Sequence, residues 1–468
     1  MASRVARFAD RALQTGGVWL AVALVVILYS PAIDSAYRLD DFAWLCLRNT
    51  IAGGRSVFWA VFSPQAQGTI RPLGERLWFL LASSQFGLNP VPMHVLALCA
   101  QVANVVLMAD TGWRLVGSRK AAGLAAILWV INATLVEPLV WASASNEVFC
   151  TFWFLAAFNA LLRWIPSQKA LWLGVHVVAL VLSLGALELA VTFPAMAAVY
   201  FSLLARRHWK VLLPCVAIVV LYVAVHVAVA PLPNKGPYRL SAGWGVAGIF
   251  WCYWANALGP ERVAAALLSS AILLWLGICS LRKCWVPLFC LLWFVVTLAP
   301  MLPLREHVTP YYTFLPSIGL AWFAGDALTG AVSWPGRSIG IACALLYAVC
   351  QIPSTIFVRD WNRDRSREVV EREVRLTDAV REIRRLQPEG PVFLTGLDGD
   401  QFWWGLCYGQ LGRLGFTNLH VLPDAGDHGI PIPPKEWCAT RDFQFSVEET
   451  TRLLHEGHAQ EFDISHLP

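Results

Sequence analysis

The sequence predicts an all-α polytopic membrane protein with a small α/β domain at its C-terminal end. Of its 468 residues, 57% are hydrophobic and 14% are charged, and the mean hydropathy is +0.55. A soluble protein of this length would need far more charge to cover its surface. Apolar stretches of helix length recur as far as Phe357, and charged residues are dense beyond it. The composition therefore separates a membrane part from a polar tail.

The apolar stretches give the predicted number of membrane spans. A span needs about 17–20 predominantly apolar residues. Eleven segments meet this requirement: 16–33, 92–114, 121–136, 147–165, 170–187, 190–205, 210–230, 263–281, 285–303, 310–330 and 337–357. A further apolar segment, 74–87, is too short to be a clear span. Arg4, Arg7 and Arg11 precede the first segment, which we interpret as an uncleaved span.

The basic residues between these segments predict the orientation of the chain. Loops on the cytoplasmic side of a membrane are enriched in Lys and Arg. If 74–87 lies along the membrane interface, every second loop is basic. These loops contain Arg119, Lys120, Arg163, Lys169, Arg206, Arg207, Lys210, Arg282, Lys283 and Arg337. We therefore expect a protein of the cytoplasmic (inner) membrane with a cytoplasmic N-terminus and an extracytoplasmic C-terminal domain.

The predicted domains are a transmembrane domain, 1–357, with a first outer loop at 34–91, and an extracytoplasmic α/β domain, 358–468. Within the latter, apolar periodicity predicts a helix over 361–387. Two strands, "PVFLTGL" and "NLHVLP", and two helices, "QFWWGLCYGQLGRLG" and "SVEETTRLLHEG", are expected to follow. Ser446 and Glu449 have the spacing of a helix-capping box. Cys407 and Cys438 can form a disulfide if this domain is in an oxidising compartment.

Two adjacent carboxylates, Asp40 and Asp41, stand just beyond the first predicted span. Such a pair is often a solvated loop end or a helix cap. Near the membrane, however, a carboxylate becomes more basic, or it holds a divalent ion. The pair is therefore a candidate general base and a candidate site for Mg²⁺ or Mn²⁺, with no other cofactor expected.

Other predicted outer segments contain cations and aromatic residues. Arg71, Arg305 and His307 are candidates for binding a phosphate, because guanidinium groups bind phosphate in bidentate fashion. Arg71 alone is equally explained as an arginine that reaches toward lipid headgroups. Four residues at the predicted outer ends of spans are candidates for supporting roles: Glu137, Glu188, Tyr311 and Tyr312.

Four segments in this order resemble the GT-C superfamily of membrane glycosyltransferases, which includes the protein O-mannosyltransferases. They are "DDF" at 40–42, "RPLGERLWFLLASSQFGLNPVPMHVLALCAQVANVVL" at 71–107, "INATLVEPLVWASASNEVFCTFWFLAAF" at 131–158 and "HVTPYYTFLPSIGLAWFAG" at 307–325. The resemblance covers roughly the first 160 residues and the last of these segments. It implies a GT-C-like fold for the membrane part.

The resemblance also implies an activity. It is the transfer of a sugar from a polyprenyl-phosphate donor to a glycan, lipid or protein acceptor on the outer face of the membrane. Asp40 or Asp41 would be the general base or a metal ligand, and Arg71 and Arg305 would bind the donor phosphate. Two other functions stay open: a transporter or flippase of a lipid-linked glycan, and a non-catalytic membrane scaffold. Membrane lipids are expected partners, and nucleic acid is not.

Overall fold

The computed structural model describes residues 2–45, 47–62, 70–230, 238–241, 243–259, 261–330, 334–386, 390–396, 418–422 and 445–463. The chain divides into two compact units, and each is treated by itself. The first, here called the membrane unit, consists of Met1–Ile33, His94–Val140 and Ala144–Asp360. The second, the loop unit, consists of Asp34–Met93, Trp141–Ser143 and Trp361–Pro468. The first predicted outer loop and most of the predicted tail domain thus belong to the same unit.

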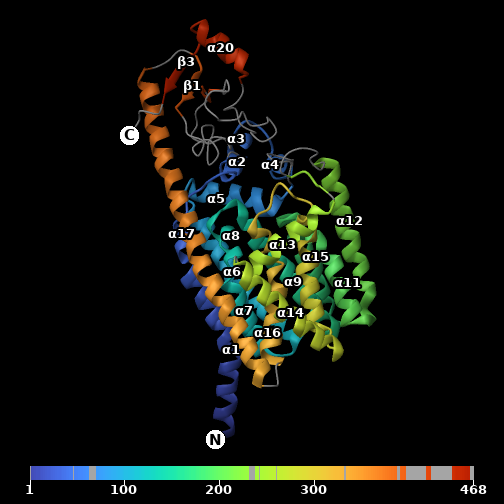
Figure 1. Cartoon of the computed structure of the whole chain (residues 1–468). Coiled ribbons are helices and arrows are strands. Elements are labelled where there is room, and N and C mark those ends of the chain that lie inside the picture. Colours follow the sequence, from blue (N-terminus) through green and yellow to red (C-terminus); the bar gives the residue numbers. More distant parts are fainter. Residues whose placement is uncertain are drawn as a thin grey trace. The chain divides into compact units, whose positions relative to one another are not determined.

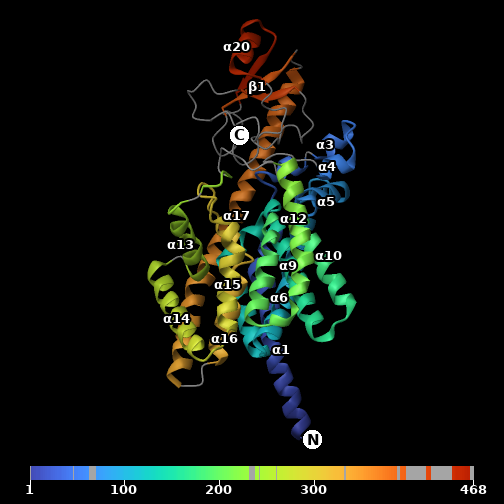
Figure 2. The same cartoon turned by 90° about the vertical axis from the view of Figure 1, so that its right-hand side faces the viewer.

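Helices build the membrane unit (Figure 1). They are α1 (Ala2–Tyr29), α6 (Val91–Val116), α7 (Arg119–Val130), α8 (Glu137–Val140), α9 (Asn146–Ser167), α10 (Ala170–Ala186), α11 (Phe193–Leu203), α12 (Leu212–Val229), α13 (Gly245–Leu258), α14 (Arg262–Leu281), α15 (Val286–Leu298), α16 (Ser317–Gly330) and the first half of α17 (Trp334–Leu386). α15 and α16 run side by side and pack together (Figure 2).

Among the residues that the structure describes, six helices are long and apolar enough to cross a membrane. They are Gly16–Asp34, Val91–Val116, Ser143–Ser167, Arg206–Val229, Arg262–Leu281 and Gly336–Glu368. The pair Arg119–Val130 and Ala133–Val140 is a seventh candidate, although the two helices meet at an angle of 67°. The predicted helical, multi-pass membrane protein is therefore confirmed.

The other four predicted spans are helical but short. Three are the apolar helices Ala170–Ala186, Glu188–Leu203 and Val286–Met301, and the fourth is α16, with 14 residues. The chain turns sharply between the first two, because Leu187 is extended after α10. The total of eleven spans stays a prediction. The segment 74–87 is not among the candidate spans, and its interfacial location is likewise a prediction.

Small residues bring the helices of the membrane unit into close contact. A Cβ atom at Gly17 of α1 would lie 3.0 Å from Gly123 Cα of α7, so the two backbones touch. At Gly325 of α16, a Cβ atom would collide with the carbonyl oxygen of Ala121 of α7. Small residues allow such close approach where lipid provides no hydrophobic driving force. α7 is thereby held between α1 and α16.

The backbone after α7 leaves the helical path, and side chains satisfy its polar groups. Tyr29 Oη donates to the Val130 carbonyl over 2.7 Å, and Thr355 Oγ1 donates to the Ile131 carbonyl over 2.8 Å. The amide of Ala133 donates to Gln351 Oε1 over 2.9 Å. Because an unpaired backbone group inside a membrane costs several kcal/mol, these bonds allow the break between α7 and α8.

Short helices around one apolar core form the first part of the loop unit. They are α2 (Asp41–Leu45), α3 (Leu47–Ala52), α4 (Val57–Phe62), the π-helical turn Pro72–Leu77 and α5 (Trp78–Phe86). Their shared core contains Tyr37, Phe42, Trp44, Leu45, Leu47, Ala60, Val61, Phe79, Leu80, Ala82, Met93 and Ala142. This core anchors the carboxylate pair at the start of α2.

The second part of the loop unit contains the end of α17 and three strands. The strands are β1 (Val392–Thr395), β2 (Leu419–Val421) and β3 (Gln460–Asp463), in a parallel sheet of order β2-β1-β3. The helix over 361–387 and the first two strands are confirmed, whereas β3 was not predicted. Ser446 caps α20 (Val447–His455), since its Oγ accepts a hydrogen bond from the Glu449 amide, as predicted. The expected helix at 401–415, Cys407 and Cys438 lie outside the described residues.

Candidate functional site

A strained turn presents the two carboxylates of the loop unit. Leu39 has a φ of +52°, in the left-handed region that Leu rarely adopts. The amide of Asp41 donates to the Arg38 carbonyl over 3.1 Å, and that of Phe42 donates to the Leu39 carbonyl over 3.2 Å. The turn allows the neighbouring Asp40 and Asp41 side chains to enter different surroundings.

The Asp41 carboxylate is fully buried and accepts hydrogen bonds from neighbouring residues. Its Oδ1 accepts hydrogen bonds from the Ser143 amide over 2.7 Å and from the Ser143 hydroxyl over 2.5 Å. Its Oδ2 accepts a hydrogen bond from the Arg38 amide over 2.9 Å. Burial raises the pKa of Asp41 to about 6, and these hydrogen bonds offset part of the rise. Both oxygens of Asp41 thus hold backbone in place.

Asp40 differs from its neighbour in its partners. Its Oδ1 atom is buried and has no hydrogen-bond partner among the described residues. Burial, followed by the charges of Asp41 and Glu75, raises the pKa of Asp40 well above its usual value. The Ser143 hydroxyl and Arg71 offset part of this rise. A general base needs a carboxylate oxygen that is free to accept a proton, and its pKa is usually raised. Asp40 has both features.

The π-helical turn Pro72–Leu77 places Arg71 beside this pair. The amides of both Glu75 and Arg76 donate to the Arg71 carbonyl, and the second bond gives the turn its π geometry. Arg71 Nη1 donates to Glu75 Oε1 over 2.5 Å, with Glu75 buried and Arg71 about one-fifth exposed. π-turns are frequent at functional sites because they change the direction of side chains within a helix. Here the turn adds a cation and a third carboxylate to the site.

The loop-unit site contains residues that were not predicted as site residues from the sequence. Ser143 and Arg38 bind Asp41, and Glu75 pairs with Arg71. Ser143 lies in "WASASNE", a segment that carried the resemblance, so the order of segments was the available signal. Nothing in the sequence distinguishes Arg38 from other arginines near a membrane.

The structure describes no complete set of metal ligands at the carboxylate pair. Each Asp41 oxygen accepts at least one hydrogen bond from the protein. Among the residues that the structure describes, no group of three His, Cys, Asp or Glu side chains has the geometry of a metal site. The divalent ion expected at this pair stays a prediction.

The membrane unit holds the other candidate cations. The guanidinium of Arg305 packs against Gly245 at the start of α13, where any Cβ atom would collide with it. Helix N-termini carry a partial positive charge, so this cation and the helix end reinforce each other. Arg305 is exposed and makes no ion pair within the described parts of the chain. This positively charged corner suits an anion.

Aromatic rings surround His307 near Arg305. The centroid of its ring lies 4.6 Å from that of Tyr238 and 5.8 Å from that of Tyr312. Tyr311 and Tyr312 are buried, with ring centroids 4.9 Å apart. The segment Pro310–Thr313 packs against the turn Ala133–Leu135, two residues before Glu137. The structure thus gathers His307, Tyr311 and Tyr312.

Glu188 lies elsewhere in the membrane unit, in the turn Glu188–Thr192. Its Oε1 is 3.4 Å from His226 Nε2 of α12, and both side chains are partly exposed. This contact joins the turn to α12. The site candidates therefore fall into three groups: Asp40, Asp41 and Arg71 in the loop unit, the aromatic group with Arg305 and Glu137 in the membrane unit, and Glu188 with His226.

Comparisons with solved structures define the class of the fold. The chain has a GT-C-like fold, as the four segments predicted. It superposes on ArnT from Cupriavidus metallidurans, crystallised with undecaprenyl phosphate, with a TM-score of 0.54 and 13% identity. The alignment covers 94% of this chain and 91% of ArnT. At this identity the likeness concerns the fold.

Two structures of the Archaeoglobus fulgidus oligosaccharyltransferase also match, each at 13% identity. The apo form gives a TM-score of 0.46, and the complex with Zn and sulfate gives 0.45. The alignments cover 75% and 74% of this chain but only 56% and 53% of that protein, so the chain spans about half of its length. No protein-family model and no curated protein sequence matches the chain.

Proposed function

We propose that the protein is a membrane glycosyltransferase that moves a sugar from a polyprenyl-phosphate donor to an acceptor on the outer face of the cytoplasmic membrane. The observation that carries this proposal is the buried Oδ1 of Asp40, which has no hydrogen-bond partner in the described part of the chain and lies beside Asp41, Glu75 and Arg71. The GT-C fold supports it, and so does the undecaprenyl phosphate bound to ArnT, which has that fold.

The two aspartates have separate roles in this proposal. Asp40 is the general base: its Oδ1 takes the proton from an acceptor hydroxyl as the hydroxyl oxygen attacks the anomeric carbon of the donor. The bond between that carbon and the phosphate oxygen breaks, and the polyprenyl phosphate leaves with inversion at the carbon. Asp41 is a positioning residue, which holds the Arg38 and Ser143 backbone around Asp40.

Cations bind the phosphate in this scheme. Arg71 is partly exposed beside the carboxylates, and Glu75 holds its guanidinium in place. Arg305, in the membrane unit, is a second candidate for binding a phosphate. Charges that are fixed before the reaction stabilise a leaving phosphate at little reorganisation cost. The proposal leaves the sugar and the acceptor open.

The test is a transfer assay in membranes that contain the full chain. Undecaprenyl phosphate carrying tritiated mannose, glucose or galactose is supplied in separate reactions, and label is followed from the lipid fraction into acceptor fractions. We expect transfer from at least one donor with the wild type, and a decrease of at least about 100-fold with Asp40→Asn.

Asp34→Asn is the matched control, because Asp34 is an exposed acid near the same membrane boundary. It should transfer at the wild-type rate. Full activity of Asp40→Asn would remove Asp40 from the mechanism. Movement of the labelled donor across the membrane without any transfer product would instead favour the flippase alternative.

A further inference from the structure

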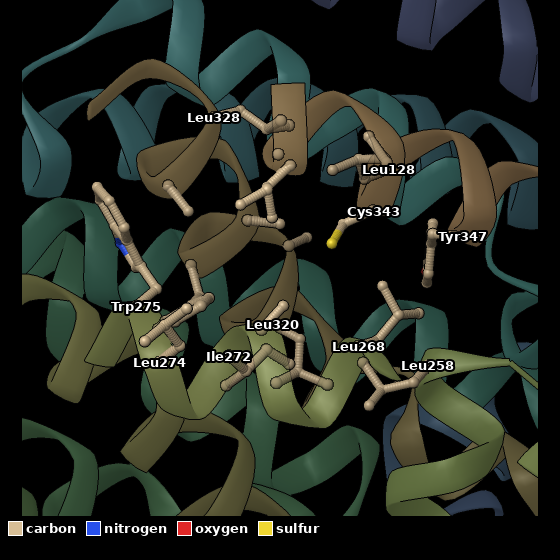
Figure 3. A pocket seen from close by; sticks show the side chains of 18 of the residues that line it. Leu128, Leu258, Leu268, Ile272, Leu274, Trp275, Leu320, Leu328, Cys343 and Tyr347 are labelled. Atoms are coloured by element: carbon tan, nitrogen blue, oxygen red, sulfur yellow. The ribbon is translucent and has the colours of Figure 1, made fainter. Parts of the chain in front are cut away.

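A cavity of about 490 Å³ lies inside the membrane unit (Figure 3). α14, α16 and α17 supply most of its wall, and Leu128 of α7 and Leu258 of α13 complete it. The side chains that face it are mainly apolar, as Figure 3 shows for Leu268, Ile272 and Leu320. Its volume lies within the range of ligand-binding pockets, about 300–1,000 Å³.

The cavity is long, and part of its lining is exposed on the surface of the membrane unit. Its lining follows α14 from Leu268 to Arg282, a rise of about 21 Å. This exceeds the thickness of one hydrocarbon leaflet, which is about half of the 30 Å core. Leu274 and Ile339 line the cavity and are 61% and 53% exposed. A hydrocarbon chain can therefore enter sideways from the bilayer.

One end of the cavity is polar, but its polar atoms already form hydrogen bonds within the protein. Asn132 donates to Tyr347 Oη and to the Ala257 carbonyl. The Ser317 hydroxyl accepts from Trp129 Nε1 and donates to the Phe314 carbonyl. A sugar or phosphate at this end would have to compete with these bonds. We therefore do not expect the sugar and phosphate of the proposed donor to bind at this end.

The opposite end of the cavity carries positive charge. Arg282 lines it at the end of α14, is exposed, and forms no ion pair among the residues that the structure describes. Lys283 follows it in sequence, and Gly336, beside Arg337, lines the cavity too. The loop charges predict that this end faces the cytoplasm. Basic pockets between membrane helices on that side suit anionic lipid headgroups.

We propose that this cavity binds an anionic glycerophospholipid of the cytoplasmic leaflet, with one acyl chain along α14 and its phosphate at Arg282. The apolar wall takes the chain, and the guanidinium binds the phosphate oxygens. This lipid is distinct from the sugar donor. Its headgroup lies at the Arg282 end, whereas the proposed reaction takes place at the outer face.

The experiment is a lipid titration of the purified full chain, followed by native mass spectrometry. The probes are phosphatidylglycerol, phosphatidylethanolamine as the zwitterionic comparison, and undecaprenyl phosphate as a competitor. We expect phosphatidylglycerol to bind more tightly than phosphatidylethanolamine. Arg282→Gln should weaken phosphatidylglycerol binding about tenfold, which corresponds to the loss of one charge-assisted contact. Lys210→Gln, in another predicted cytoplasmic loop, should bind like the wild type.

A second pair of variants tests the apolar wall. Ala271→Phe, which faces the cavity from α14, should lose one bound phosphatidylglycerol. Ala266→Phe, on the exposed face of the same helix, should keep it. The proposal is overturned if Ala271→Phe retains all bound lipid, or if undecaprenyl phosphate displaces phosphatidylglycerol from the wild type and from Arg282→Gln equally. If Ala271→Phe does not fold, unchanged binding by Arg282→Gln alone overturns it.

Discussion

The carboxylates of the loop unit and Asp110 of the membrane unit occupy opposite electrostatic surroundings. Asp110 Oδ2 accepts hydrogen bonds from Arg114 Nε over 2.9 Å, from Asn159 Nδ2 over 2.8 Å and from Arg163 Nη2 over 2.8 Å. It joins α6 to α9 with its charge compensated. Asp40, by contrast, has two other carboxylates near it and a buried oxygen to which no described residue donates a hydrogen bond.

This difference separates two uses of a buried acid. A compensated carboxylate stabilises the fold, because its removal leaves two arginines without their partner. An undercompensated carboxylate destabilises the ionised state, which the fold tolerates where chemistry requires a base. We therefore expect the removal of Asp40 to lower activity but not stability. The removal of Asp110 should lower stability but not activity.

The largest expected effect comes from removing each acid in turn. Asp40→Asn should lower sugar transfer by about 10²–10⁴-fold, the usual contribution of a general base, and leave the unfolding temperature unchanged or higher. Asp110→Asn should lower the stability by about 2 kcal/mol and keep the transfer rate per folded molecule. Transfer assays and thermal unfolding of the purified variants measure both quantities. Equal activity losses in the two variants would contradict the distinction.

Ser143 provides a smaller effect within the loop-unit site. Ser143→Ala removes the hydroxyl that donates to Asp41 Oδ1 and keeps the amide bond to the same oxygen. We expect a loss of about 1 kcal/mol in stability and about a tenfold lower transfer rate, because Asp41 then holds the turn less firmly. Ser84→Ala, an exposed serine of the same unit whose hydroxyl donates to the Leu81 carbonyl, is the control. A normal rate in Ser143→Ala would mean that the turn needs only the backbone bonds.

Much of the fold could be predicted from the sequence. Apolar length predicted the helices of the membrane unit, and the Ser446 cap and two strands followed from local patterns. Span length was harder to predict, because breaks such as the one after α7 depend on partners such as Thr355 and Gln351, more than 200 residues away. A local window contains no information on such partners.

The site was predictable only in part. The position of Asp40 and Asp41 beyond a span marked the pair, but their difference arises from Ser143 and from the turn at Leu39. Both depend on tertiary structure. The expectation of a metal at this pair arose from the residue types alone, and it stays a prediction, because the described residues include no complete set of metal ligands.

As the pH falls, transfer activity should decrease and stability should increase. Asp40 must be ionised to act, so transfer should decrease as the pH falls through the raised pKa of Asp40. A carboxyl whose pKa is higher when folded binds more protons in the folded state, so stability increases as the pH falls. For Asp41 this gain lies between about pH 6 and its ordinary value of 3.8. Thermal unfolding and transfer rates across pH 4–8 measure both trends.

Asp40→Asn and Asp41→Asn isolate the contribution of the pair from that of other carboxylates. Each variant should reduce the stabilisation on acidification, by about 1 °C of unfolding temperature per kcal/mol removed for a chain of 468 residues. Asp34→Asn should follow the wild-type curve, because that acid is exposed. Identical curves for all four proteins would show that the pair is not the source of the trend.

The smallest expected effect concerns backbone strain, which occurs in both units. Leu39 beside the carboxylates and Gln168 after α9 both have a φ of +52°. Glycine adopts this conformation freely, so each substitution to Gly should change stability by less than about 1 kcal/mol. Gln168→Gly should keep full transfer activity. Leu39→Gly should lower transfer by a few-fold without a loss of stability, because a flexible turn no longer directs Asp40 and Asp41 into separate surroundings. Equal activity in the two variants would mean that the strain at Leu39 follows from chain geometry and has no part in positioning the base.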